Sequence, residues 1–589
     1  MKSPLTVVVL ALGSLGGYAL QAQQPAWDSQ KPTDYRSRTI YFLLADRFNP
    51  HQPYAPYVDP EYPSATNNVN CFVQSCTAET QFRSYWGGDI HGIIQKLDYL
   101  GDLGISALWV SPLMENVRAY VPETGYGTGY HGYWVQNYYR VNAHFGSWED
   151  VNHLSQEMHA KGMRYIQDIT LNHSNPLDNH VYGRLYESDN SDQIFINSYQ
   201  RDYDPVNGMR YYKHYQCDPR CEAATKLADY DWSYWQLHHC LLADLSGYNQ
   251  HDPAVADYLL GAGKTWIDNG VDDYRLDAVK FPFPDFIATF TRTMREHLAS
   301  LHRPKPYIVG EWSNGGVGDA KSLRFANNYR FFGTNILDFQ LSFMLNQFIG
   351  GNYEDENSGQ RKNAFDLDQL LHQRVLAFNG RDTWQGTFLD NHDQIRTLVR
   401  LQKLCVKDET ERRRRMDLGT VLLLTLRGVP IIYYGDEQYL AYYNDGQNTP
   451  PEYVNSGNDD PWNRSGLNRW DQTTPAFKII KTLAKLRKES PAIWQGRYVT
   501  AYVDKDILIY ERIEKGEVVL VAVNRGEEKT ITLRGSLGLP TGYYTGLLAD
   551  ASDGNQGNYV SVTAKELTVH LNKLSSLVVH PQTANNVFN

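Results

Sequence analysis

Four short apolar stretches of the sequence end in carboxylate and imidazole side chains. In chain order, these endings are 168–173 (DITLNH), 273–277 (DYRLD), 310–312 (GEW) and 390–393 (DNHD). One ionised carboxylate and one protonated carboxylic acid, held close together, are the groups that cleavage of a glycosidic bond requires. We therefore take Asp277, Glu311 and Asp393 as candidate catalytic residues.

Arg275 precedes Asp277 by two residues, so in a strand both side chains point to the same face. A guanidinium beside a carboxylate lowers its pKa and keeps it ionised, as a nucleophile requires. Glu311 follows an apolar strand and precedes Trp312, and such a setting predicts the raised pKa of a general acid. Taken singly, an Arg-x-Asp motif is more often a structural ion pair. The ordered set on successive strands favours the catalytic interpretation.

Eight apolar segments, each followed by enough residues for a helix, predict an α/β fold, the (β/α)₈ TIM barrel. They are 40–44, 107–111, 165–171, 273–277, 307–311, 335–339, 386–390 and 429–433. Active sites of such barrels lie at the C-terminal ends of the strands, where the four chemical motifs fall.

The spacing of the segments predicts three structural domains. The third and fourth segments lie about a hundred residues apart, far more than one crossover needs, so 174–241 is expected to form an inserted domain B after strand 3. The barrel then comprises 35–173 and 242–490. Residues 491–589 show short alternating segments between Gly, Asn and Asp turns, which predicts a C-terminal antiparallel β-sandwich.

The net charge of −11 argues against nucleic acid or an anionic membrane as the main partner. The basic run Arg412–Arg415 follows acidic residues and precedes an apolar stretch, so we expect the solvated start of a helix. Aromatic residues make up 13% of the chain, which suits either sugar binding or core packing.

The N-terminus predicts export. Lys2, an apolar run and Ala22 form the pattern of a cleaved signal peptide over 1–22, so we expect a secreted protein in which disulfides are possible. Two cysteine pairs, Cys71/Cys76 and Cys217/Cys221, are close enough in sequence to join locally. Cys240 and Cys405 are left as a long-range pair or as two free thiols.

These motifs together resemble the α-amylase family, glycoside hydrolase family 13. The resemblance rests on 168–173, 270–280, Glu311 and 388–393, with further agreement at 242–246 and 428–435. It extends from about Arg36 to His580 and implies domains A, B and C, a glycoside-cleaving enzyme and an α-glucan substrate.

The resemblance also implies roles for individual residues. Asp277 would be the nucleophile, Glu311 the general acid/base and Asp393 the transition-state stabiliser, with Arg275 orienting Asp277. The remaining substrate contacts would come from His131, Tyr133, Trp134, His173, Lys280, His392, Asp460 and Arg464. The family's structural Ca²⁺ would be bound by Asn172, Asp244 and the backbone carbonyl of Phe281, where the family usually has His.

Within the family, the likeness is greatest to the cyclodextrin glucanotransferase and α-amylase branch. Two departures lie on the acceptor side: Cys240 stands where those transferases have a large aromatic residue, and Ser313 stands where they have Phe. The chain also shows domains A, B and C only, and Pro50 weakens a second calcium site. We therefore expect hydrolysis: a secreted, retaining, monomeric α-amylase acting on α-1,4 bonds of starch and maltooligosaccharides.

Two alternatives stay open. One is a cyclodextrin glucanotransferase or maltogenic transglycosylase of the same family. The other is a catalytically inactive carbohydrate-binding protein on the same fold, which would be expected to have lost one of the carboxylates.

Overall fold

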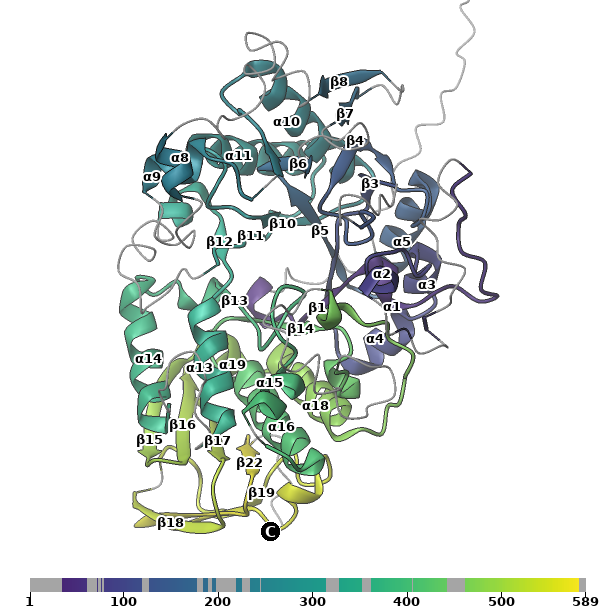
Figure 1. Ribbon diagram of the computed structural model, residues 1–589. Helices are drawn as coiled ribbons and strands as arrows, with labels where there is room; N and C mark the ends of the chain where they lie inside the picture. The colour runs from purple at the N-terminus through teal and green to yellow at the C-terminus, as the bar shows by residue number, and fades with distance from the viewer. Residues whose placement is uncertain are drawn as a thin grey trace, which may run out of the picture.

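A computed structural model describes most of the chain (Figure 1). The described residues are 34–60, 71–72, 76, 79–118, 127–176, 184–188, 193–197, 219–224, 233–243, 245–313, 328–351, 362–404, 406–441, 461–535 and 537–581. The predicted signal peptide lies outside them and remains a prediction.

Eight parallel strands form the centre of the molecule (Figure 1). They are β1 (Ile40–Leu43), β2 (Ala107–Val110), β5 (Arg164–Thr170), β10 (Asp273–Asp277), β11 (Ile308–Gly310), β12 (Asn335–Ile336), β13 (Gly386–Thr387) and β14 (Val429–Tyr433). The sheet order is β12-β11-β10-β5-β2-β1-β14-β13, and a parallel bridge between Leu337 and Gly386 joins its two edges. The predicted barrel and its eight strand segments are therefore confirmed.

Helices surround the strands, and most of them bury one face against the barrel, whereas α16 is buried on all sides from Met416 to Thr425. The main ones are α3 (Ile90–Ile94), α4 (Leu97–Leu103), α5 (Trp148–Ala160), α10 (Pro253–Asp268), α11 (Pro284–Ser300), α13 (Phe339–Gly350), α14 (Ala364–Ala377), α15 (Thr397–Lys403), α16 (Glu409–Thr425) and α18 (Pro475–Glu489). On α11, Phe286, Phe290 and Met294 recur at helical spacing and are buried. Ser147 and Asp150 form a capping box that begins α5.

Short elements connect and extend the barrel. They are α1 (Ala45–Phe48), α2 (Glu79–Phe82), β3 (Met114–Asn116), β4 (Val135–Val141), β6 (His173–Pro176), β7 (Arg184–Tyr186), β8 (Ile194–Asn197), α8 (Pro219–Ala224), α9 (Tyr234–His239), β9 (Leu245–Gly247) and α19 (Pro491–Trp494). Strands β6 and β9 pair antiparallel directly after β5, so the inserted segment leaves the barrel and returns to it at the C-terminal end of that strand.

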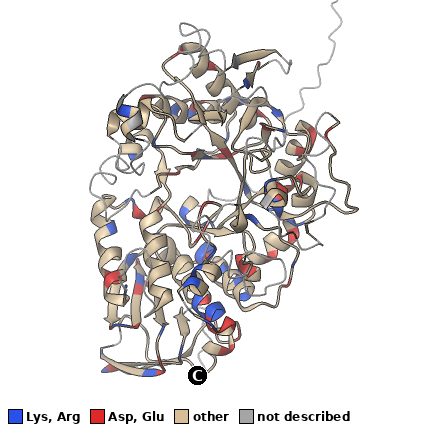
Figure 2. Ribbon diagram, in the orientation of Figure 1, with Lys and Arg blue, Asp and Glu red and all other residues tan. Residues whose placement is uncertain are grey.

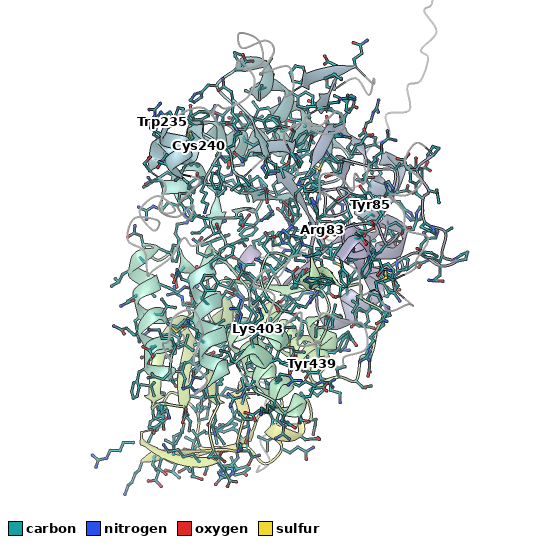
Figure 3. All side chains as sticks on the ribbon, viewed as in Figure 1. Arg83, Tyr85, Trp235, Cys240, Lys403 and Tyr439 are labelled. Carbon is teal, nitrogen blue, oxygen red and sulfur yellow. A yellow bond between two sulfur atoms is a disulfide. The ribbon has the colours of Figure 1, made fainter. Side chains whose placement is uncertain are left out.

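Two disulfides are described. Cys71–Cys76 confirms the first predicted local pair. The predicted pairing of Cys217 with Cys221 is wrong, because Cys221 on α8 is bonded to Cys240, which follows α9. Figure 3 labels Cys240 at this place. The packing of these two helices, rather than nearness in sequence, selects the partner. Cys217 and Cys405 lie outside the described residues.

The C-terminal strands form two four-stranded antiparallel sheets, as predicted for a β-sandwich. The first is β15-β16-β17-β22 and the second β18-β21-β20-β19. Their bounds are β15 (Arg497–Val503), β16 (Ile507–Glu514), β17 (Glu517–Asn524), β18 (Lys529–Arg534), β19 (Gly542–Thr545), β20 (Tyr559–Val562), β21 (Glu566–Leu571) and β22 (Ser575–Val579). Ile509, Leu520, Val560 and Val569 are buried in the apolar layer between the sheets. Figure 1 shows these strands at one end of the molecule, beyond α13–α16.

The basic run on α16 only partly meets its prediction. Asp408 caps the helix, so the predicted helix start is confirmed. Arg412 and Arg415 are buried rather than solvated, because their guanidiniums donate to the carbonyls of Val406 and Ile349. Elsewhere Lys and Arg are interspersed with Asp and Glu (Figure 2). Among the described residues, no helix has the length and apolar character of a membrane span.

We expect the two disulfides to contribute unequally to stability. Cys221–Cys240 spans 19 residues and Cys71–Cys76 spans 5, and chain entropy predicts about 3 and about 2 kcal/mol for loops of these lengths. The double variant Cys221→Ser/Cys240→Ser should therefore have a lower Tm than Cys71→Ser/Cys76→Ser in differential scanning calorimetry. The opposite order would contradict this account.

Candidate active site

Arg275 lies at the centre of a cluster of carboxylates at the C-terminal ends of the strands. Its guanidinium contacts Asp168 at 3.0 Å, Asp277 at 2.8 Å and Glu311 at 2.7 Å, and it is 1% exposed. The register explains the contacts. Arg275 on β10 is paired with Asp168 on β5 and with Val309 on β11, which places Glu311 just beyond the neighbouring strand end.

Asp168 is a member of this cluster that the predicted site does not include. Its carboxylate is fully buried and accepts hydrogen bonds from Trp109 Nε1 at 2.9 Å and Tyr133 Oη at 2.8 Å. It thereby links the Arg275 side chain to the aromatic wall of the site. The sequence motif 168–173 contains Asp168 and could have pointed to it. The family resemblance assigns roles only to the last two residues of that motif, Asn172 and His173.

The charge balance of the cluster corrects one expectation. Burial raises the pKa of Asp277 well above its ordinary value, and the neighbouring carboxylates of Glu311 and Asp168 raise it further. Arg275 opposes this shift but is shared among three carboxylates. Arg275 therefore acts in the expected direction on the Asp277 pKa, but the expected net lowering is wrong, because burial and the neighbouring carboxylates outweigh it.

Asp393 is held from two sides at the edge of the site. Arg464 Nη2 donates to its Oδ1 at 3.0 Å, and His392 Nε2 lies 3.2 Å from its Oδ2. Arg464 Nε also donates to the His392 carbonyl at 3.0 Å. The Asp393 side chain is 42% exposed, so its carboxylate remains accessible to a ligand.

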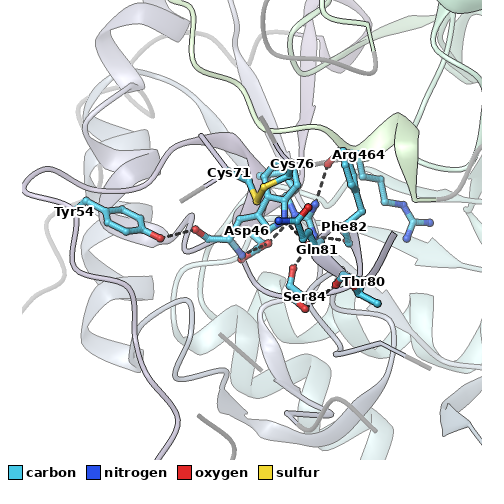
Figure 4. Close-up of a disulfide and its surroundings, with 11 residues drawn as sticks. Asp46, Tyr54, Cys71, Cys76, Thr80, Gln81, Phe82, Ser84 and Arg464 are labelled. Atoms are coloured by element: carbon cyan, nitrogen blue, oxygen red, sulfur yellow. Dashed lines mark hydrogen bonds and ion pairs between the residues drawn. A yellow bond between two sulfur atoms is a disulfide. The ribbon is translucent and has the colours of Figure 1, made fainter. Parts of the chain in front are cut away.

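The Cys71–Cys76 disulfide supports the segment that carries Arg464 (Figure 4). It packs in an apolar cluster with Trp86 and Trp462. The Arg464 carbonyl accepts a hydrogen bond from Arg47 Nη1 at 3.2 Å. Arg464 is predicted to bind substrate. Its guanidinium also holds the Asp393 carboxylate in place.

Aromatic rings line one wall of the site. Tyr133 stacks on His392 with ring centroids 4.9 Å apart, and Trp134 meets His131 edge-to-face at 4.7 Å. Burial, together with the charge of Arg464, lowers the pKa of both His131 and His392 well below the ordinary value. Both imidazoles are therefore neutral at neutral pH, which suits hydrogen bonding to sugar hydroxyls.

Of the two departures noted in the sequence, Ser313 lines the cavity that holds Asp277 and Glu311, and Cys240 does not. Lys280 Nζ donates to Ser313 Oγ at 2.7 Å. Cys240 is buried in a small apolar cluster with Phe281, where it forms its disulfide. Within the described residues, neither position presents an aromatic ring to the cavity.

One cavity of about 320 Å³ joins these groups. The predicted site residues that line it are His131, Tyr133, Trp134, His173, Asp277, Lys280, Phe281, Glu311, His392, Asp393 and Arg464. Arg275 is not part of the lining but contacts two of its residues, Asp277 and Glu311. Asp460 and Asp244 fall outside the described residues.

The residues predicted to bind calcium fit that ion in donor type. Asn172 is buried beside His173, and the Phe281 carbonyl lies 3.2 Å from His238 Nδ1. An amide oxygen and a carbonyl are the hard donors that Ca²⁺ prefers. Among the described residues, no three His, Cys, Asp or Glu side chains are placed to hold a metal ion. That finding does not test the predicted calcium ligands, because Asp244 is their only residue of these four types and it lies outside the described residues.

Comparison with known proteins assigns the family. Residues 42–463 match the family described as alpha amylase, catalytic domain. The chain belongs to the α-amylase family. It is a glycoside-acting enzyme of that family, as its carboxylate cluster indicates.

Relatives within the α-amylase family cover nearly the whole chain. A cyclomaltodextrin glucanotransferase of Klebsiella oxytoca is 34% identical over 569 residues, which are 93% of this chain and 78% of that protein. An α-amylase of Niallia circulans is 29% identical over 567 residues, which are 94% and 93% of the two chains. The crystal structure of CldA, described as the first cyclomaltodextrin glucanotransferase with a three-domain ABC distribution, superposes with a TM-score of 0.73 at 28% identity. The match covers 92% of this chain and 98% of CldA.

Proposed function

We propose that this protein cleaves α-1,4-glucosidic bonds with retention and transfers the glucosyl chain chiefly to a sugar hydroxyl, as a cyclodextrin glucanotransferase does. The observation that carries this proposal is the Arg275-centred carboxylate cluster within a chain whose curated relatives include several cyclomaltodextrin glucanotransferases. The substrate class is an α-glucan.

The residues of the cluster suit a two-step reaction. Glu311 donates its proton to the glycosidic oxygen while Asp277 attacks the anomeric carbon, so the bond to the leaving sugar breaks as the glycosyl-enzyme ester forms. Glu311, now ionised, accepts a proton from the incoming hydroxyl, which displaces Asp277 and restores the original configuration. Arg275 contacts both carboxylates and stabilises whichever is ionised.

Transfer replaces hydrolysis as the leading proposal. The expectation of hydrolysis rested partly on the presence of domains A, B and C only, and CldA is described as a cyclomaltodextrin glucanotransferase with that same distribution. Hydrolysis remains the second candidate, because Cys240 and Ser313 provide no aromatic surface for a sugar acceptor.

The product pattern on soluble starch tests this choice. The purified protein is incubated with starch, and samples from the first minutes are separated by chromatography. Cyclic products as the main early species support the transferase. Linear maltooligosaccharides formed from the start, with a matching rise in reducing ends, would support the hydrolase instead.

Replacing Ser313 with Phe should shift the reaction further toward transfer. An aromatic ring on the acceptor side adds a stacking surface worth about 0.5–1.5 kcal/mol, or roughly a 2- to 13-fold rise in the ratio of transfer to hydrolysis. The ratio is measured as cyclic products per new reducing end. Ser313→Ala, which removes the hydroxyl that accepts from Lys280 without adding a ring, is the matched control, and an equal rise there would contradict the explanation.

We also infer that the protein binds Ca²⁺ through Asn172, Asp244 and the Phe281 carbonyl. Removing the ion with a chelator should lower the Tm, because a ligand that binds only the folded state stabilises it. Added Ca²⁺ should restore the Tm, and Asn172→Ala should make the Tm insensitive to both treatments.

We also propose that the protein is exported after removal of the signal peptide. N-terminal sequencing of the secreted protein tests this, and we expect the chain to begin after residue 22.

A further inference from the structure

A second and larger cavity lies at the opposite end of the barrel. It encloses about 740 Å³ and is bordered by the N-terminal ends of the strands: Arg38 precedes β1, Arg164 opens β5 and Tyr307 precedes β11. Its lining shares no residue with the cavity that holds Asp277 and Glu311. The chemistry proposed above therefore does not account for it.

The lining of this cavity is strongly basic, although the whole chain carries a net charge of −11. Eight of its residues are cationic and one, Glu489, is acidic. The cationic residues are Arg38, Lys161, Arg164, Arg295, Lys305, Arg381, Lys485 and Lys488. Ion pairs with Asp273 and Asp98 neutralise Arg164 and Lys161, and the lining keeps an excess of positive charge.

Arg295 and Arg381 converge without a carboxylate partner in the described part of the chain. Arg295 donates to the Gly333 carbonyl at 2.7 Å, and Arg381 lies 3.4 Å from the Asn335 side-chain oxygen. The Nε–H of each is buried and has no hydrogen-bond acceptor among the described residues. Burial and the charge of Arg381 lower the pKa of Arg295. Two like charges held together in this way are stabilised by an anion placed between them.

A glycine at position 333 leaves room for the Arg295 guanidinium against the backbone. Gly333 has a φ of +79°, and a Cβ built there would lie 2.0 Å from Arg295 Nη2. A side chain at this position would therefore displace Arg295 from the cavity wall. The presence of glycine keeps the guanidinium against the backbone and directed along the lining.

We propose that this cavity binds a small phosphate-bearing ligand, with Arg295 and Arg381 contacting the phosphate. Planar guanidiniums match phosphate oxygens, and the exposed lysines Lys305, Lys485 and Lys488 on the rim favour a multiply charged anion. Trp384, a half-buried residue of the lining, offers aromatic surface for an attached sugar ring, as in a sugar phosphate.

Isothermal titration calorimetry at low ionic strength tests the proposal with three probes: inorganic phosphate, glucose 1-phosphate and citrate. We expect both phosphates to bind and Arg295→Gln/Arg381→Gln to weaken binding at least 10-fold. Lys485→Gln/Lys488→Gln changes two exposed residues of α18 and should weaken it about 3-fold without affecting folding. The control Arg534→Gln, exposed on β18, should leave it unchanged.

The probes also identify the source of the phosphate. Tighter binding of glucose 1-phosphate supports a sugar phosphate, and equal binding supports inorganic phosphate. Absence of phosphate binding at millimolar concentration would overturn the proposal, as would binding that neither pair of substitutions weakens. Citrate binding more tightly than both phosphates would also overturn it.

Discussion

Asp277→Asn should lower kcat on α-1,4-glucans by about 10⁴-fold or more, because the amide cannot form the glycosyl-enzyme ester. The shape of the side chain is retained, and Arg275 keeps Asp168 and Glu311 as partners. The measurement is the initial rate of cleavage of a chromogenic maltooligosaccharide, with folding checked by calorimetry.

Loss of stability is not expected to explain this result. Burial and neighbouring carboxylates raise the pKa of Asp277, so its ionised form costs stability as the pH rises above the ordinary Asp range. The neutral amide in the variant removes that cost, and the variant should unfold at the same or a higher temperature at pH 7. A rate within tenfold of wild type would mean that the assigned nucleophile is not catalytic.

Asp417→Asn is the matched control. Asp417 on α16 is also a buried carboxylate, it accepts a hydrogen bond from Tyr439 Oη at 2.7 Å, and burial raises its pKa to about 7. It lines neither cavity. The same chemical change there should leave kcat unchanged and should stabilise the protein above pH 7, where the native carboxylate would be ionised.

The strands could be predicted because each is a short buried run with polar residues at its end. Alternation within one strand was also sufficient to place Arg275 beside Asp277, and their 2.8 Å contact agrees with this. The pKa direction of Asp277 could not be predicted in the same way. It depends on Asp168 and Glu311, which reach Arg275 from two other strands and divide its charge.

Contacts between different helices also determine features that local sequence patterns do not predict. Cys221 joins Cys240 because α8 and α9 pack together, a fact that spacing along the chain does not contain. Arg415 is buried because the carbonyl at the end of α13 lies within reach of its guanidinium. In each case the deciding partner is remote in sequence, and local patterns carry no information about it.

Glu311→Gln should separate the two roles proposed for this residue. On starch, whose leaving group must be protonated, we expect kcat to fall about 10²- to 10⁴-fold. On α-maltosyl fluoride, where fluoride departs without a proton, formation of the glycosyl-enzyme should stay within about tenfold of wild type. The intermediate should then accumulate, because the base that activates the acceptor is missing.

Azide completes the test because it is an acceptor that needs no deprotonation. It should restore turnover of α-maltosyl fluoride by the Glu311→Gln variant and yield the α-configured maltosyl azide, since two displacements at one carbon retain configuration. Glu437→Gln is the matched control: Glu437 is buried, accepts hydrogen bonds from Tyr41 and Tyr99, and lines neither cavity. The Glu437→Gln variant should turn over α-maltosyl fluoride at the wild-type rate without added azide. A β-configured azide would mean that Asp277 forms no covalent intermediate, and an unchanged rate on starch would remove Glu311 from the proton transfer.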